Sequence, residues 1–201
     1  MYTAWEDLKN ACLGCTKCPL CEGRTNLVFG CGNINAEVML IGEGPGQNED
    51  LQGLPFVGRS GKLLDSLLAE VDLSRDKNIY IANMVKCRPP QNRDPLPEEQ
   101  EACIDWLRNQ VAIIKPKIIV AVGRIAAMRI IDPSIKITKQ HGMFYKKKKV
   151  WMMPTIHPAA VLRNPNQKEL VREDLQNLKE KILRFCRWVW QECKDVKTFL
   201  L

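Results

Sequence analysis

Residues 37–46 read EVMLIGEGPG, a short apolar run that ends in a glycine-rich turn. Three further runs have the same character: residues 78–83 (NIYIAN), 117–122 (KIIVAV) and 150–156 (VWMMPTI). Each is short, unbroken and rich in β-branched or large apolar residues, which is typical of strands covered on both faces of a parallel sheet. The four runs therefore predict the strands of one buried sheet.

Helical patterns separate these four runs. A helix with one apolar stripe is expected after Ser60, which is a candidate N-cap. A second is expected to start at Pro97, since proline followed by two glutamates is typical of a first helical turn. A short helix should follow Gly123, and a long amphipathic helix should follow residues 164–165. Strands alternating with helices predict an α/β fold, a single three-layer α/β/α domain over residues 1–201 with a central four-stranded parallel sheet.

Composition and apolar patterning argue against a disordered, membrane-spanning or exported protein. The chain has 201 residues, of which 45% are hydrophobic and 26% are charged, so a packed core is expected and disorder is not. The longest apolar run, residues 118–122, is far shorter than the roughly 18–20 residues of a membrane span, and the start of the chain lacks a signal-peptide pattern. We therefore expect a cytoplasmic protein. Its net charge of +7 suits a polyanionic partner.

Polar or glycine-rich residues follow three of the four predicted strands. The first strand runs into the glycine-rich residues 42–46, the second ends at Asn83, and the fourth is followed by His157. Taken singly, these are a tight turn, a capping residue and a loop histidine. In open α/β sheets, however, ligands bind at the carboxyl ends of the strands. Their shared position predicts a site at that edge of the sheet.

Nine cysteines is a high number for a chain without an export signal, and it indicates metal or cluster ligation rather than disulfides. Cys12, Cys15, Cys18 and Cys21 recur every third residue, so pairs of thiolates could reach one centre. Zinc and an iron–sulfur cluster both fit this spacing, which does not say which four residues are ligands. The remaining cysteines are Cys31, Cys87, Cys103, Cys186 and Cys193, the last two of which we expect to be buried or idle.

Four collinear motifs carry a resemblance to a known family: GEGPGQNED (42–50), LPFVGRSGKLL (54–64), NMVKCRPPQNR (83–93) and HPAAVLRNP (157–165). They closely resemble the family 4 uracil-DNA glycosylases, the thermostable iron–sulfur type. The resemblance implies the uracil-DNA glycosylase superfamily fold. It also implies a monofunctional hydrolase of base excision repair, which flips uracil out of single- or double-stranded DNA and leaves an abasic site.

The resemblance also implies a cofactor. Members of this family hold a [4Fe-4S] cluster on a CxxC pair and two later cysteines, which here are Cys15, Cys18, Cys87 and Cys103. The cluster would be structural, and it would tie an N-terminal segment, about residues 10–35, to the loop after the second strand. The C-terminal helix and tail would cover about residues 166–201. Cys12, Cys21 and Cys31 fall outside the family's pattern.

Within the implied pocket, Phe56 would stack on the uracil ring and Asn83 would read its edge. The Asn83 carbonyl can accept from N3–H while its amide donates to O4, and cytosine presents the opposite pattern at both positions. Backbone groups of Gly42, Glu43 and Gly44 would hold the remaining uracil edge. Glu43 is also the candidate for rejecting thymine at C5.

The expected catalytic residues are Glu43, His157 and Asn83. A neutral His157 would donate to uracil O2 and stabilise the uracil anion as the bond to C1′ breaks. Water would be activated by Glu43 or Glu49, or simply positioned by the backbone and Asn83. The resemblance thus implies the reaction without identifying a general base.

DNA contacts are expected from Arg163 and Leu162, in a loop over residues 157–165 that would fill the gap left by the flipped base, and from Arg88, near DNA or the cluster. Lysines 146–149 predict a hairpin tip with solvated charges and, second, a phosphate contact. His141 is expected to be structural.

Two alternatives stay open at this stage. One is a non-catalytic iron–sulfur domain on the same fold that binds DNA or assists a polymerase, and it would not need Asn83, Phe56 and His157 together. The other is an electron-transfer protein that uses residues 12–21. We expect a monomer whose partner is uracil-containing DNA; a sliding-clamp contact cannot be read from the sequence. The segment with Trp188 and Trp190 could be core, a dimer contact or a frayed end.

Overall fold

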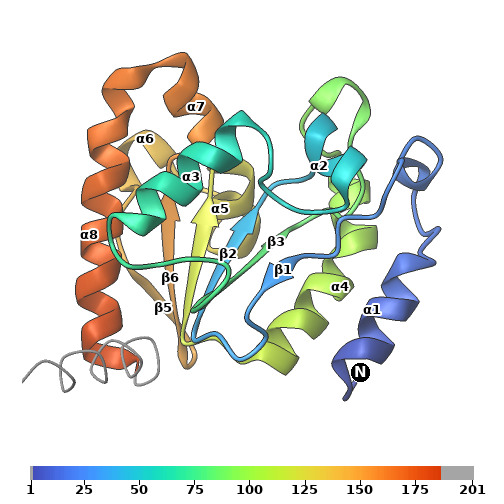
Figure 1. The fold of residues 1–201 in the computed structure, drawn as a ribbon, viewed down its shortest axis with the longest axis horizontal. Coiled ribbons are helices and arrows are strands. Elements are labelled where there is room, and N and C mark those ends of the chain that lie inside the picture. Colours follow the sequence, from blue (N-terminus) through green and yellow to red (C-terminus); the bar gives the residue numbers. More distant parts are fainter. Residues whose placement is uncertain (1, 187–201) are drawn as a thin grey trace, which may run out of the picture.

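The structure is a computed structural model that describes residues 2–186. The positions of Trp188, Trp190 and Cys193 lie outside the described residues. A six-stranded sheet in the order β1-β3-β2-β4-β6-β5 forms the centre of the molecule (Figure 1).

The four strands expected from the sequence form the middle of this sheet. They are β2 (Val38–Gly42), β3 (Ile79–Asn83), β4 (Ile118–Val122) and β6 (Val150–Thr155), and neighbouring strands among them run parallel. Every residue of β2, β3 and β4 is buried, as expected of strands with helices on both faces. The prediction of four parallel strands, with bounds correct to about a residue, is confirmed.

Two short edge strands make the sheet mixed. β1 (Cys31–Gly32) runs antiparallel to β3, and β5 (Tyr145–Lys147) runs antiparallel to β6. The pattern analysis did not find them because two residues carry no period and β5 carries two lysines instead of an apolar run. The β5–β6 hairpin confirms the predicted hairpin, and its lysines blunt an exposed sheet edge.

Helices cover both faces of the sheet and give the predicted three layers (Figure 1). One face packs against α3 (Arg59–Ala69), α7 (Pro158–Arg163) and α8 (Lys168–Phe185), and the other packs against α4 (Pro97–Ile114) and α5 (Arg124–Ile130). The start of α4 at Pro97 and the N-cap of α5 at Gly123 agree with the sequence prediction.

The shorter helices surround this core. α1 (Trp5–Leu13) packs against α4, with a third apolar cluster beneath it. α2 (Gln47–Gln52) follows the glycine-rich turn, and α6 (Ile137–Gln140) precedes the β5–β6 hairpin. Single 3-10 turns lie at Pro19–Cys21, Pro90–Asn92 and Pro165–Gln167.

The start of α3 differs from the prediction. The helix begins at Arg59 with Gly58 as its N-cap, and Ser60 is already inside it. The Gly58 amide donates to Glu49 Oε1 at 2.8 Å, so a carboxylate from another helix supplies an acceptor at this end. A long-range contact of this kind leaves no mark in the local sequence.

Residues 157–165 were expected to be a loop, and the structure shows that most of them are helical. α7 starts at Pro158, and the His157 side chain caps it by accepting from the Ala159 amide. Proline at the first helical position is favourable because that position needs no N–H donor. The motif was too short for a helical period to show.

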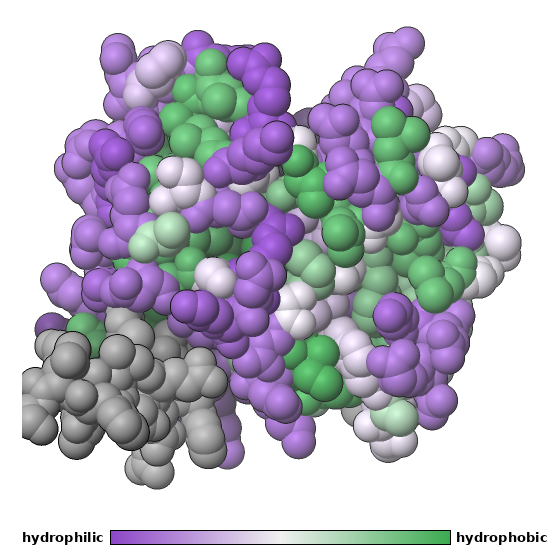
Figure 2. All heavy atoms as spheres, viewed as in Figure 1, coloured by the Kyte–Doolittle hydropathy of each residue, from purple (hydrophilic) through white to green (hydrophobic). Residues whose placement is uncertain are grey.

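Hydrophilic residues cover much of the outer surface of α3 and α8 (Figure 2), as expected for helices that cover a sheet and face water. Among residues 2–186, the structure has no helix both long enough and apolar enough to cross a bilayer.

Candidate active site

A cleft of about 660 Å³ opens at the carboxyl ends of the parallel strands. Of the residues expected at the site, it brings together Glu43, Gly44, Phe56, Asn83, His157 and Arg163. Residues from four segments far apart in the sequence therefore share one cavity, at the edge of the sheet that the strand pattern indicated.

Asn83 is the most buried polar residue that lines the cleft. It is the last residue of β3, its side chain is 1% exposed, and it lies opposite Gly42 in the parallel register. Its Oδ1 atom is buried and accepts no hydrogen bond from any described residue. A buried acceptor without a donor costs roughly 1–3 kcal/mol, and such groups are common where a bound molecule supplies the donor.

Gly42 makes room for this amide. A Cβ at Gly42 would collide with Asn83 Oδ1 and would lie 2.6 Å from Phe56 Cζ. The absence of a side chain at the end of β2 therefore lets the amide and the aromatic ring approach the same point.

Phe56 occupies an unusual backbone conformation. Its φ is +52°, in the left-handed region that residues other than glycine seldom adopt. Arg75 holds this turn from one side by donating to the carbonyl of Pro55 at 2.7 Å and to that of Phe56 at 2.8 Å. The strain is thus stabilised by specific contacts, and strain of this kind clusters at ligand sites.

Glu49 holds the same turn from the other side. Its carboxylate accepts from the backbone amides of Gly46 at 3.1 Å, Val57 at 2.9 Å and Gly58 at 2.8 Å. These contacts join the glycine-rich turn after β2 to the turn that carries Phe56. Both oxygens are occupied by backbone donors, which favours a positioning role over activation of water.

His157 has a defined tautomer. Its Nδ1 accepts from the Ala159 amide at 3.1 Å, so the proton of the neutral ring lies on Nε2. Burial, followed by the nearby Arg163 guanidinium, lowers the pKa of His157 to about 4, while Glu49 opposes the shift. The ring centroid lies 5.7 Å from that of Phe56. The residue is therefore a neutral hydrogen-bond donor at physiological pH.

Glu43, which the sequence indicated, lies in a small charged cluster with Asp94 and Arg124, which it did not. Burial and then the neighbouring Asp94 carboxylate raise the pKa of Glu43 to about 7, whereas Arg124 opposes this rise. Arg124 donates to Asp94 Oδ2 at 2.7 Å, and all three residues line the cleft. Asp94 lies in the loop before α4 and Arg124 is the first residue of α5, and no spacing in the sequence relates them.

The residues expected to contact DNA divide into two groups. Arg163 lines the cleft, whereas Leu162 and Arg88 do not. Leu162 is exposed on α7, and Arg88 Nε donates to Asn92 Oδ1 at 2.8 Å. Gln167, which the sequence did not single out, also lines the cleft, and its buried Oε1 has no partner among the described residues.

The four cysteines expected to be ligands converge in a separate small hollow, together with Cys21. It is lined by Cys15, Cys18, Cys21, Cys87 and Cys103. Three N–H groups point at three of these sulfurs: Trp106 Nε1 to Cys15 at 3.2 Å, Arg24 Nη1 to Cys87 at 3.3 Å, and the Lys86 amide to Cys103 at 3.3 Å. Donors aimed at sulfur are what cluster thiolates require, so the residues present fit an iron–sulfur cluster.

The other cysteines lie elsewhere or at the margin. Cys12 is fully buried in the apolar cluster beneath α1, and Cys31 Sγ accepts from Arg75 at 3.4 Å. Within residues 2–186, no three His, Cys, Asp or Glu side chains are placed to hold a single metal ion, whereas a cluster takes one thiolate at each iron. The prediction that Cys186 is buried is confirmed.

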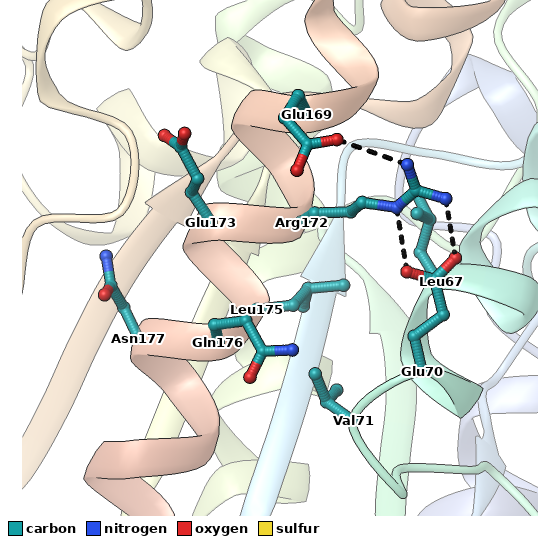
Figure 3. Close-up of a pocket in the computed structure, with 9 residues that line it drawn as sticks. All are labelled: Leu67, Glu70, Val71, Glu169, Arg172, Glu173, Leu175, Gln176 and Asn177. Atoms are coloured by element: carbon teal, nitrogen blue, oxygen red, sulfur yellow. Dashed lines mark hydrogen bonds and ion pairs between the residues drawn. The ribbon is translucent and has the colours of Figure 1, made fainter.

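A second hollow of about 280 Å³ lies between α3 and α8 and shares no residue with the cleft (Figure 3). Arg172 bridges it by donating to both carboxylate oxygens of Glu70, at 2.8 and 3.1 Å, and to Glu169 at 3.2 Å. These side chains are partly or largely exposed and satisfied by one another, which is typical of a contact that joins two surface helices.

Comparison with known proteins identifies the family. The sequence model of the Uracil DNA glycosylase superfamily matches residues 29–179. The chain is 45% identical over 184 residues to the type-4 uracil-DNA glycosylase of Sulfurisphaera tokodaii, covering 87% of this chain and 83% of that protein.

Two further relatives of the same type give similar values. Identity is 43% to the Archaeoglobus fulgidus protein, covering 87% of this chain and 92% of the relative. It is 46% to the Thermotoga maritima protein, covering 82% and 88%. The chain therefore belongs to the uracil DNA glycosylase superfamily, among its type-4 members.

Proposed function

We propose that uracil-containing DNA, single- or double-stranded, presents a flipped uracil to the 660 Å³ cleft, where Asn83, His157 and Glu43 divide recognition and catalysis. As a member of its family the chain is a DNA repair glycosylase, a monofunctional enzyme that hydrolyses the bond between uracil and deoxyribose. The observation that carries the proposed roles is the buried, unpartnered Oδ1 of Asn83 beside Phe56 and Gly42.

Recognition follows from the donor and acceptor pattern of the Asn83 amide. Its Oδ1 accepts from uracil N3–H, and its amide group donates to O4. Cytosine lacks the N3–H donor and presents an amino group in place of O4, so both contacts are lost in a buried site. Phe56 stacks on the ring and contributes affinity without selecting the base. Backbone groups of Gly42, Glu43 and Gly44 hold the remaining edge.

His157 supports departure of the base. As the C1′–N1 bond breaks, its electron pair stays on uracil, which leaves as an anion while the sugar becomes cation-like. The Nε2–H of neutral His157 donates to O2, where the negative charge collects. A histidine that remained charged would be a strong donor but would require a counter-ion, and the low pKa supports the neutral form.

Glu43 completes the hydrolysis. A water molecule adds its oxygen to C1′, and one of its protons goes to the Glu43 carboxylate. A pKa of about 7 leaves a large fraction of Glu43 ionised at neutral pH and makes it basic enough to accept that proton. Glu43 is preferred to Glu49 as the general base because Glu49 is occupied by three backbone amides.

A [4Fe-4S] cluster on Cys15, Cys18, Cys87 and Cys103 is the proposed cofactor. When bound, it supplies a structural cross-link and no redox step. The sulfur-directed donors Trp106, Arg24 and the Lys86 amide support it. The segment of about residues 10–35 would then be the cluster-binding part of the one domain, and residues 166–201 its C-terminal helix and tail.

Contacts outside the pocket complete the proposal. Arg163 at the cleft and exposed Leu162 on α7 would fill the space left by the flipped base, and Arg88 would contact DNA nearby. The enzyme would act as a cytoplasmic monomer. Curated glycosylases among its relatives favour excision over the non-catalytic and electron-transfer alternatives.

The catalytic assignments are tested with a 5′-labelled oligonucleotide that holds one uracil, cleaved by alkali after incubation. His157→Ala and Glu43→Gln should each slow excision about 100-fold or more, while DNA affinity stays within about twofold. Glu6→Gln, at an exposed position on α1, is the matched control and should behave as wild type. Wild-type rates in either active-site variant would remove that residue from the mechanism.

A further inference from the structure

Lys86 is a lysine with no exposed surface, three residues beyond Asn83 and next to Cys87. Its Nζ donates to the backbone carbonyl of Asn83 at 2.8 Å and to Gln110 Oε1 at 2.7 Å. Lysine is almost never fully buried in proteins unless it is paired. Neither the strand pattern nor the proposed catalytic roles explain why a charge lies here.

The surroundings of Lys86 indicate where its counter-charge comes from. Both hydrogen-bond acceptors are neutral, so they satisfy donors without balancing the charge. Lys86 lines the cysteine hollow together with Cys87 and Cys103, and its backbone amide donates to Cys103 Sγ at 3.3 Å. Cysteines that hold a cluster are thiolates, so the cysteine hollow supplies negative charge on this side of Lys86.

The other side of Lys86 fixes the residue that reads uracil. Beyond Asn83 the chain continues to pair with the glycine-rich turn, with Met84 donating to Gly42 at 3.0 Å and Val85 to Glu43 at 3.1 Å. The Asn83 carbonyl instead meets the Lys86 ammonium. This contact sets the orientation of the peptide that carries the orphaned amide.

Gln110 connects the Lys86 ammonium to α4, the helix that covers one face of the sheet. It belongs to α4, is fully buried, and donates to the carbonyl of Phe29 at 2.9 Å. The contacts therefore run from α4 through Gln110 and Lys86 to the end of β3. Cys103, also on α4, lies on the cysteine side of the same lysine.

We propose that Lys86 is a positioning residue that couples the four-cysteine hollow to the uracil pocket, holding the Asn83 peptide in register and balancing its charge against the cysteine sulfurs. This inference rests on the proposed roles of Asn83 and of the four cysteines. It gives the cluster a part in base recognition in addition to cross-linking the N-terminal segment. Loss of the lysine should then affect both sites at once.

Lys86→Met is the direct test because methionine fills a similar volume without charge or donor. Lys9→Met is the matched control, because Lys9 is exposed on α1 and lines neither the cysteine hollow nor the cleft. Three quantities are measured: iron per chain, the rate at which a chelator bleaches the absorbance near 400 nm, and single-turnover excision at saturating enzyme with DNA affinity alongside.

In Lys86→Met the cluster should bleach at least about fivefold faster. Molecules reconstituted to full iron should excise uracil at least about tenfold more slowly, with DNA affinity within about twofold of wild type. Lys9→Met should match wild type in all three measurements. Lys86→Gln keeps a donor without the charge, so it should recover part of the excision rate but not the bleaching rate, and it serves as the second variant if methionine prevents folding.

A fully loaded Lys86→Met or Lys86→Gln protein with wild-type bleaching and excision would overturn the coupling. Faster bleaching with unchanged excision would also overturn it, because Lys86 would then serve the cluster alone. An inactive wild-type protein would instead count against the proposed roles of the pocket, so the two failures are distinguishable.

Discussion

At the scale of single residues, the site depends on the lack of a side chain at Gly42 and on the Asn83 Oδ1 atom, which has no hydrogen-bond donor among the described residues. Gly42 leaves space that Asn83 Oδ1 and the Phe56 ring both approach, and this oxygen is buried without a donor among the described residues. A buried acceptor without a donor destabilises the ligand-free protein, and it is expected where a ligand supplies the donor.

Gly42→Ala tests this arrangement. The added methyl would displace Asn83 Oδ1 and lie 2.6 Å from Phe56 Cζ, so we expect excision to slow by about 100-fold. Because the collision is with side chains that can move, the fold should survive, with a melting temperature lowered by only a few degrees. Single-turnover kinetics and thermal unfolding measure the two effects. An active Gly42→Ala protein would show that this close approach is dispensable.

His157 gives a prediction for stability against pH. Its pKa is about 4 in the folded state and near 6.5 when unfolded, so the unfolded chain binds the proton first as pH falls. Stability contributed by neutral His157 is therefore complete above about pH 6.5 and is lost on the way down to pH 4, by on the order of 3 kcal/mol. Denaturant unfolding of wild type and His157→Ala across this range should show a shallower decline in the variant. Parallel curves would contradict the low pKa.

At the scale of elements, the middle of the sheet could be predicted and its surroundings could not. β2, β3, β4 and β6 are runs of buried apolar residues, and this pattern is local. The start of α3 and the turn at Phe56 depend instead on Glu49 and Arg75, whose partners lie 8 to 20 residues away along the chain. The strand ends indicated where the pocket lies, while Asp94, Arg124 and Gln167 joined it only through tertiary folding.

Glu49→Gln tests the link between α2 and the turn before α3. The amide group of glutamine keeps one acceptor oxygen and places a donor against backbone donors, so we expect a loss of about 1–3 kcal/mol of unfolding free energy. Displacement of Phe56 should raise KM more than it lowers kcat. A wild-type KM with a kcat that no longer rises with pH would instead assign Glu49 to water activation.

At the scale of the whole molecule, the cleft and the cysteine hollow are separate sites of one α/β unit. The net charge of +7 favours a DNA backbone, and Arg163 brings a cation to the rim of the cleft. The cysteines of α4 and of the N-terminal segment gather in their own hollow. In the proposed mechanism, the cleft residues recognise DNA and uracil, the cysteines cross-link the chain, and Lys86 connects the two sites.

Salt dependence tests the contribution of Arg163. If its guanidinium neutralises one phosphate, Arg163→Gln should weaken binding to uracil-free DNA and reduce the slope of log K against log salt by about 0.9 on duplex DNA. Arg108→Gln, an exposed arginine paired with Asp105 on α4, should leave the slope unchanged. Equal slopes in Arg163→Gln and wild type would place Arg163 away from the backbone of bound DNA.

The central claim is that the Asn83 amide reads uracil, and the most direct measurement is single-turnover excision by wild type and Asn83→Asp. Both are tested on matched duplexes that hold one uracil or one cytosine opposite guanine. An ionised carboxylate accepts from N3–H but cannot donate to O4, so we expect excision of uracil to fall about 100-fold or more at unchanged DNA affinity. Wild type should leave cytosine intact. Undiminished excision of uracil by Asn83→Asp would contradict the account, because the buried amide would then have no part in choosing the base.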